Sequence, residues 1–159
     1  MHTSTAPFAA HSSDRAPLVT PTGDQAIVMA GTEKTGGSLT VIELINQPKN
    51  GPPLHSHIRD DEVWYVLEGE YRFKAGDAMF VVSEGGMAFG PHGMPHSFQN
   101  VGTAPARLLI ITTPAGAERY FEDFAKLPPG PIDPEALAAL ALDSGIELLG
   151  PPLGVSDPL

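Results

Sequence analysis

Short runs of β-favouring residues alternate with turns of Gly, Pro, Asn and Asp through residues 26–113. Glycine and proline supply 17 residues each of the 159, and the 42% of apolar residues between these turns suffice for a core. We expect strands at residues 26–30, 38–45, 63–67, 71–74, 78–82, 87–89, 96–99 and 107–112. About eight short strands at this spacing predict an all-β fold, either a small sandwich or a jelly-roll barrel.

The pattern changes to a helical one after residue 113. Thr113 and Pro114 predict a helix start, because threonine is a favoured N-cap and proline suits the first helical position. Asp133 and Pro134 repeat this signal for a second short helix, and Gly145 is the expected C-cap. The sequence therefore predicts two C-terminal helices packed on the barrel.

These patterns divide the chain into three parts. Residues 1–17 are rich in Ala, Ser, Thr and Pro without periodicity, and are expected to form a loose N-terminal arm. A second interpretation is that this arm exchanges with a partner subunit. Residues 18–113 form the expected β-barrel, and residues 114–159 the helical extension.

The charge balance excludes several partners. The chain has 19 acidic and 9 basic residues, giving a net charge of −10. Neutralising phosphates requires a cationic face, so neither nucleic acid nor an anionic membrane is an expected partner. No apolar run of signal-peptide length follows Met1, and the apolar stretch at residues 108–111 is too short to span a bilayer. We therefore expect a cytoplasmic protein.

Four histidines lie outside the arm, and three of them are candidate metal ligands. His55 and His57 lie two residues apart, so on a strand both side chains point to the same face. Glu62 follows on the next β segment, and His96 begins a later one. The chain has no cysteine, so any metal must be held by nitrogen and oxygen. Three imidazoles and one carboxylate suit a divalent transition metal, although H-x-H alone is also common among ordinary surface or core histidines.

The residues around these histidines form two motifs. Residues 51–69 read GPPLHSHIRDDEVWYVLEG, and residues 85–100 read GGMAFGPHGMPHSFQN. They resemble the two signature motifs of the cupin superfamily. The second motif matches at every defined position, namely Gly85, Pro91, Gly93, His96 and Asn100. The first matches at His55, His57, Glu62 and Gly69. It departs only at the leading glycine, where Lys49 stands and Gly51 comes two residues later.

The resemblance implies a cupin jelly-roll barrel with one divalent metal, which could be iron, nickel, manganese, cobalt or copper. The ligands it implies are His55, His57, Glu62 and His96. Asp61 is an alternative carboxylate, but only Glu62 leaves six residues before Gly69. Asp60 and Asp61 are then expected to be a solvated pair in the turn, and His92 a loop residue. Cupins that resemble this chain are commonly homodimers.

Strand parity predicts the lining of a substrate pocket. Trp64 and Val66 share the face of Glu62, and Phe98 shares that of His96. Phe89, beside the following turn, is expected to complete an apolar wall. Each of these side chains, taken singly, also fits ordinary core packing. Together they predict a small hydrophobic chamber suited to an aromatic or polyketide-like ligand.

The chain resembles the small quercetin 2,3-dioxygenase-like cupins in particular. This resemblance implies a metal-dependent dioxygenase acting on a flavonol-like or other secondary metabolite. Glu62 would be both a metal ligand and the general base, and dioxygen the second substrate. An alternative is a non-oxidative lyase, decarboxylase, isomerase or cyclase that uses the metal as a Lewis acid. A further alternative is a cupin that binds a small molecule without catalysis.

Overall fold

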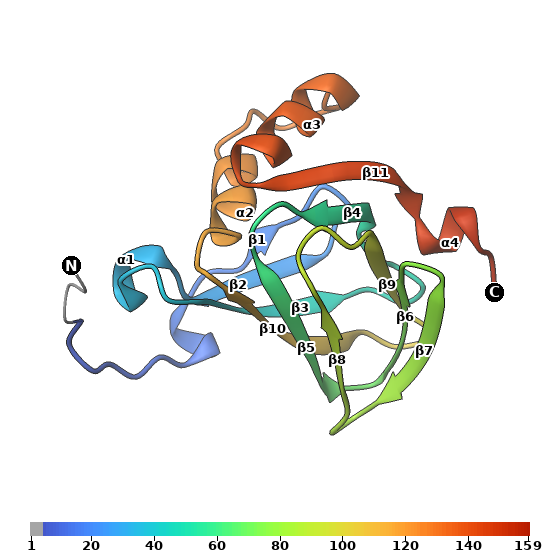
Figure 1. Cartoon of the computed structure of the whole chain (residues 1–159), viewed down its shortest axis with the longest axis horizontal. Helices are drawn as coiled ribbons and strands as arrows, with labels where there is room; N and C mark the ends of the chain where they lie inside the picture. The colour runs from blue at the N-terminus through green and yellow to red at the C-terminus, as the bar shows by residue number, and fades with distance from the viewer. Residues whose placement is uncertain (1–4) are drawn as a thin grey trace.

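The computed structural model describes residues 5–159, which form two antiparallel sheets packed face to face (Figure 1). The first sheet contains, in order, β1 (Leu18–Val19), β2 (Gln25–Ala30), β3 (Thr40–Asn46), β10 (Ala106–Thr113), β5 (Asp61–Glu68) and β8 (Met87–Gly90). The second contains β11 (Ile146–Pro152), β4 (Pro53–His57), β9 (His96–Asn100), β6 (Glu70–Ala75) and β7 (Ala78–Ser83). This two-sheet jelly roll is the predicted all-β fold.

Short helices complete the described chain. They are the 3-10 turn η1 (Ser12–Asp14) and the α-helices α1 (Thr32–Thr35), α2 (Glu118–Ala125), α3 (Pro134–Asp143) and α4 (Leu153–Ser156). Helices α2 and α3 contact each other, α2 contacts β1, and α3 contacts β11 (Figure 1). Helices α2 and α3 therefore lie together on one side of the barrel, and the interior belongs to the two sheets.

Alternation along the strands places the core between the sheets. In β10 the buried residues Leu108, Ile110 and Thr112 alternate with half-buried ones, as a strand packed on one face requires. The other sheet contributes Phe73 and Phe98, whose rings lie 5.9 Å apart between centroids. Side chains from both sheets thus fill the barrel. The polar cluster described below also lies between the two sheets.

The predicted start of the first C-terminal helix is wrong. Thr113 is the last residue of β10, where it pairs with Asp61, and its hydroxyl donates to the carbonyl of Ser38. Helix α2 begins four residues beyond Pro114, at Glu118. The strand ladder therefore overrides the local capping signal.

The second predicted helix agrees closely with the structure. The Asp133 carboxylate accepts a hydrogen bond from the amide of Ala136, and Pro134 is the first residue of α3. The helix ends at Asp143 with Ser144 as its C-cap, and Gly145 follows with a φ of 79°. Gly145 is thus one residue beyond the expected position, in the left-handed conformation that glycine tolerates.

The sequence predicts a helical C-terminal extension, but part of this extension is a strand. Residues 146–152 form β11, which pairs with β4 and adds an edge strand to the second sheet. In this pairing Ile146 lies opposite His57, and Leu148 lies opposite His55. The extension therefore supports the strand that carries two of the four histidines.

The described part of the N-terminal arm, residues 5–17, has no strand and is largely exposed. Its residues 5–8 line a surface groove together with Met29, Val41 and Leu109 of the first sheet. The first four residues of the arm lie outside the described residues. Exchange of the arm between subunits stays a prediction.

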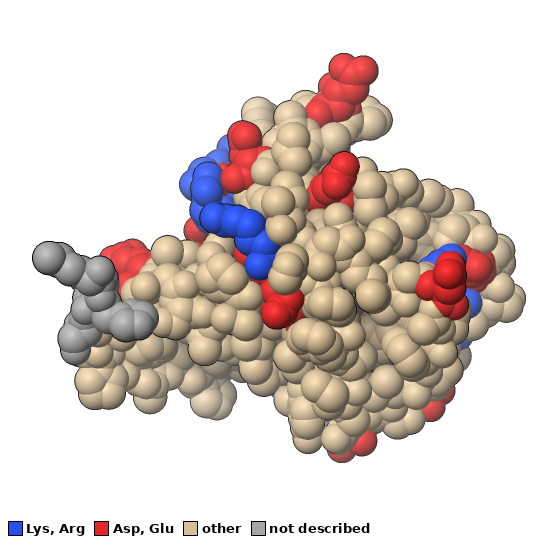
Figure 2. Space-filling view, in the orientation of Figure 1, with Lys and Arg blue, Asp and Glu red and all other residues tan. Residues whose placement is uncertain are grey.

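Charged side chains are unevenly placed on the surface. Figure 2 shows Lys and Arg side chains gathered beside α2, acidic side chains at scattered positions, and much of the barrel surface carrying neither. Among residues 5–159, no helix is long and apolar enough to cross a membrane.

Candidate metal centre

Four buried side chains meet between the two sheets, and they are the four predicted ligands. His55 and His57 come from β4, His96 from β9 and Glu62 from β5. His55 lies directly opposite His96 in the sheet, so both rings share one face. The second sheet therefore supplies three imidazoles, and the first sheet supplies one carboxylate.

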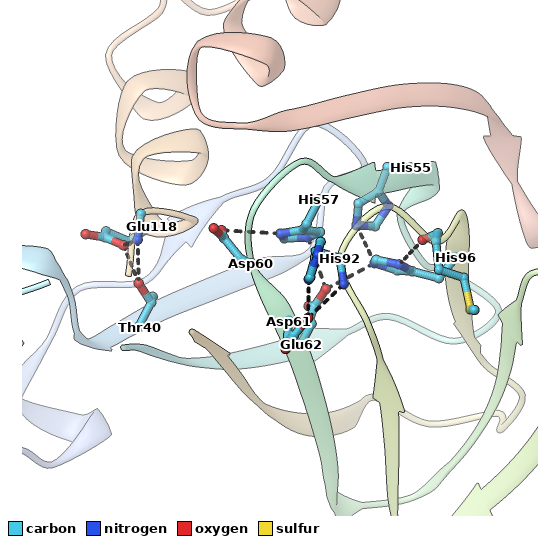
Figure 3. A network of polar contacts seen from close by, with 11 residues as sticks. Thr40, His55, His57, Asp60, Asp61, Glu62, His92, His96 and Glu118 are labelled. Atoms are coloured by element: carbon cyan, nitrogen blue, oxygen red, sulfur yellow. Dashed lines mark hydrogen bonds and ion pairs between the residues drawn. The ribbon is translucent and has the colours of Figure 1, made fainter. Parts of the chain in front are cut away.

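The ligating atoms point toward a common centre (Figure 3). One atom from each of the four residues lies within 4.8 Å of all the others. Glu62 Oε2 lies 3.0 Å from His57 Nε2 and 3.0 Å from His96 Nε2. His55 Nε2 lies 3.1 Å from His96 Nε2. These separations place three ring nitrogens and one oxygen around a single point.

Backbone carbonyls fix the orientation of two rings. His55 Nδ1 lies 2.8 Å from the carbonyl oxygen of Pro53, and His96 Nδ1 lies 3.0 Å from that of Met94. A carbonyl oxygen can only accept, so each Nδ1 carries a proton and donates it. In a neutral ring this leaves a lone pair on Nε2. Both Nε2 atoms are thus prepared to bind a cation.

Burial and neighbouring charges shift the pKa values of the cluster. Burial, aided by His96 and His57, lowers the pKa of His55 to about 3, so this ring is neutral at pH 7. For Glu62 burial acts to raise the pKa, but His57 and His96 outweigh it and hold the pKa well below its usual range. For His57 burial acts to lower the pKa, but Glu62 and Asp60 raise it to about 10. The cluster therefore pairs an ionised carboxylate with basic nitrogens.

These residues fit a divalent transition metal. Glu62 Oε2 and the Nε2 atoms of the three imidazoles crowd together at separations of 3.0–3.1 Å, and rings that donate through Nδ1 turn the Nε2 lone pairs of His55 and His96 toward each other. One cation at the centre of the cluster would satisfy all four atoms. Three imidazoles with a carboxylate are a ligand set used by several first-row metals. The cluster indicates a metal site without selecting the metal.

Comparison with known proteins agrees with this arrangement. Residues 43–112 match the cupin domain family, a segment that runs from β3 into β10 and includes all four ligands. Over this segment the chain is similar to cupin domains.

An uncharacterized protein of Methanocaldococcus jannaschii is 31% identical over 61 residues, which cover 38% of this chain and 49% of that protein. The match thus spans about half the length of this curated relative.

Two solved structures share the fold at low identity. One is a predicted oxalate decarboxylase of Thermotoga maritima, with a TM-score of 0.62 and 19% identity over 67% of this chain and 98% of that one. The other is the polyketide cyclase RemF of Streptomyces resistomycificus, with a TM-score of 0.59 and 22% identity over 68% and 80%. At these identities the likeness concerns the fold alone.

Asp60 lies beside the four-residue cluster, and the sequence interpretation missed it. Rather than lying in a solvated pair, its side chain is 2% exposed, and Oδ2 lies 3.5 Å from His57 Nδ1. Both atoms are buried without a hydrogen-bond partner. Asp60 is two residues before Glu62, so strand parity extended backwards would have placed both on one face. A carboxylate behind a metal-ligating imidazole orients the ring and raises its basicity.

Asp61 and His92 lie outside the cluster, as expected. Asp61 Oδ1 lies 2.7 Å from His92 Nδ1, and both side chains are substantially exposed. His92 is thus a loop residue, and the Asp61 carboxylate contacts His92 rather than joining the four-residue cluster.

The predicted pocket residues separate into two groups. Trp64, Val66 and Phe98 are buried inside the barrel, and the Trp64 ring centroid lies 4.9 Å from that of His96. These three also pack together in the hydrophobic core, so their contact with a substrate stays a prediction.

The prediction that Phe89 completes the wall is wrong. Phe89 lies opposite Val63 in the β5–β8 pair, and its side chain is 51% exposed. Gly90, opposite Glu62, occupies the inward position instead. A β-carbon on Gly90 would lie 2.6 Å from the Trp64 ring, so this position leaves room for the indole.

Proposed function

We propose that the protein is a metal-dependent enzyme that acts on a small organic molecule. The observation that carries this proposal is the convergence of His55, His57, Glu62 and His96 in a buried cluster. Structural metal sites are filled by protein ligands, whereas catalytic ones keep a coordination position for substrate. Four protein ligands leave one or two positions free on a five- or six-coordinate transition metal.

The first candidate reaction is dioxygenation of an aromatic, flavonol-like or related secondary metabolite. When bound, the metal would polarise an enolic or phenolic oxygen and supply redox chemistry toward dioxygen. Glu62 is buried within the cluster, so its carboxylate would be placed beside a bound substrate to accept the hydroxyl proton. The Trp64 ring, 4.9 Å from that of His96 between centroids, and Phe98, which packs with Trp64 in the core, provide apolar surroundings beside the cluster. The resemblance to quercetinase-like cupins supports this candidate, and a homodimeric state belongs to the same proposal.

A second candidate is non-oxidative lyase, decarboxylase, isomerase or cyclase chemistry. The fold is shared with a predicted oxalate decarboxylase and with a polyketide cyclase, which supports this alternative at the level of architecture. Here the metal would act as a Lewis acid only, and Glu62 would again take or return a proton. The same residues therefore serve either reaction, and dioxygen consumption separates the two.

Metal content of the purified protein tests the proposal most directly. We expect about one transition-metal ion per chain by elemental analysis, because four ligands of one site converge. His96→Ala should lose most of this metal, whereas His11→Ala, which changes an arm histidine outside the cluster, should retain it. A wild-type chain without stoichiometric metal, or a His96→Ala variant that keeps it, would refute the enzymatic assignment.

Turnover by the metal-loaded protein then distinguishes the candidates. Oxygen uptake with a panel of flavonols and phenols supports the dioxygenase, and product formation without dioxygen supports the non-oxidative class. Glu62→Gln, measured at saturating metal, should lose turnover, since an amide cannot accept the substrate proton. Unchanged turnover in Glu62→Gln would remove Glu62 from the base role. A small molecule that binds equally well to His96→Ala, without turnover in the wild type, would indicate a binding protein.

A further inference from the structure

The loop between β8 and β9, residues 91–95, contacts the segments that carry three of the four ligands. The amide of Gly93 donates to the carbonyl of His57 over 2.7 Å. The carbonyl of Met94 accepts from the ring of His96, at 3.0 Å from Nδ1. These two contacts tie the loop to β4 and β9, which both belong to the second sheet.

His92 supplies the third contact, and this one reaches the first sheet. Its backbone amide donates to Asp61 Oδ1 over 2.9 Å, and its Nδ1 lies 2.7 Å from the same oxygen. Asp61 is the first residue of β5, immediately before Glu62. Figure 3 shows His92 and Asp61 beside the ligand cluster. The side chains are 61% and 40% exposed, so this contact is made at the protein surface.

The contact matters because the ligand set is divided between the sheets. Three imidazoles stand on the second sheet and Glu62 on the first, so their separation depends on how the two sheets are joined nearby. The β4–β5 connection and the β8–β9 loop both cross from one sheet to the other. The contact between His92 and Asp61 links the β8–β9 crossing to the start of β5. The contact therefore joins the β8–β9 loop directly to β5, the strand that carries Glu62.

We propose that His92, acting through Asp61, is a positioning residue for the metal centre that holds Glu62 against the three imidazoles. The inference rests on the proposed metal site. It assigns His92 no contact with the metal, in keeping with its place outside the cluster. Its effect is to slow the loss of the ion by restricting the start of β5.

The magnitude separates this role from that of an ordinary surface pair. An exposed ion pair changes the free energy of unfolding by less than about 1 kcal/mol. Removing a residue that orients a metal ligand costs about 10- to 100-fold in metal affinity. The decisive readout is therefore metal retention at nearly unchanged stability.

The experiment uses the full chain loaded with Co²⁺ and measures release of the ion into excess chelator by the change in visible absorption. His92→Ala should release Co²⁺ about 10-fold faster than the wild type, with a corresponding loss of affinity. His92→Asn should restore slow release, because its side-chain amide can donate to Asp61 from nearly the place of Nδ1. Lys126→Ala is the matched control, because it removes an exposed 2.7 Å contact with Asp123 just beyond the end of α2.

Three results would contradict the positioning role of His92. Wild-type release rates in His92→Ala, or equally fast release from the Asn and Ala variants, would overturn the positioning role. A melting temperature of His92→Ala far below that of Lys126→Ala would also overturn it, by assigning His92 to the fold in general. If the wild-type chain takes up no Co²⁺, the metal centre itself is refuted, and this inference falls with it.

Discussion

Two buried carboxylates, Glu62 and Glu118, differ in the kind of neighbour that each one meets. Glu62 faces imidazole nitrogens that can share a metal ion. Glu118 instead accepts from the amide of Thr32 over 2.7 Å, from the hydroxyls of Thr32 and Thr40, and from the amide of Gly116 over 3.0 Å. Donors alone satisfy Glu118, so it needs no cation and serves to join α2 to α1 and β3.

The pH dependence of stability tests this role of Glu118. Burial acts to raise its pKa, but hydrogen bonds from Thr32 and Thr40 lower it below the usual 4.5. Ionised Glu118 therefore stabilises the fold above about pH 4.5, and this contribution is lost as the pH falls through the lowered pKa. Glu118→Gln should reduce the free energy of unfolding at pH 7 by about 1–3 kcal/mol.

The measurement is urea unfolding at pH 7 and at two values below pH 4.5. The difference between Glu118→Gln and the wild type should shrink as the pH falls, since both side chains are then neutral. Glu135→Gln, which changes an exposed carboxylate in the first turn of α3, should differ little from the wild type at any pH. A constant difference across the pH range would contradict the proposed role of the charge.

At the scale of elements, the placement of β4 depends on the glycine that precedes it. A β-carbon on Gly51 would lie 1.9 Å from the backbone oxygen of Phe98 in β9. Backbone atoms cannot rotate away as a flexible side chain can, so Gly51→Ala must displace the chain just before β4. The close approach therefore explains why glycine stands two residues after the position that the cupin motif assigns to it.

Gly51→Ala should consequently destabilise the protein by about 1–3 kcal/mol or more, in the range of overpacked cores. It should also weaken metal retention, because His55 and His57 follow on the displaced strand. Gly150→Ala is the control, since its β-carbon would only contact Leu54 at an ordinary 3.6 Å. Thermal unfolding and metal content measure both effects, and equal behaviour of the two variants would contradict the argument.

The elements that could be predicted from sequence are those with local patterns. The strands of residues 26–112 carry β-branched runs and turn residues, and Asp133 with Pro134 marks a helix start. Strand β11 could not be predicted, because it contains glycine and prolines and is defined by pairing with the distant β4. The same limit applies to Thr113, whose place in a ladder outweighs its capping propensity.

The metal site likewise has features that local sequence patterns predict and features that depend on long-range strand pairing. Motif spacing predicts the four ligands, because turn geometry and strand parity act over a few residues. Burial of Asp60 and exposure of Phe89 depend on where a strand begins and which strand lies beside it. These are properties of the assembled sheets, and no single segment of the sequence encodes them.

At the scale of the whole molecule, a bound metal would connect the two sheets, since the histidines and Glu62 belong to different ones. A ligand that binds only the folded state stabilises it by about 2.7 kcal/mol at a concentration 100 times its Kd. For a chain of this size, each kcal/mol raises the melting temperature by about 2–4 °C. Saturating Co²⁺ should therefore raise the melting temperature of the metal-free protein by about 5–11 °C, and chelator should reverse the rise. His96→Ala should show almost no such shift, because one of the four ligands is gone. An equal shift in that variant would place the stabilising ion elsewhere, and no shift in the wild type would mean that the cluster does not join the sheets through a metal.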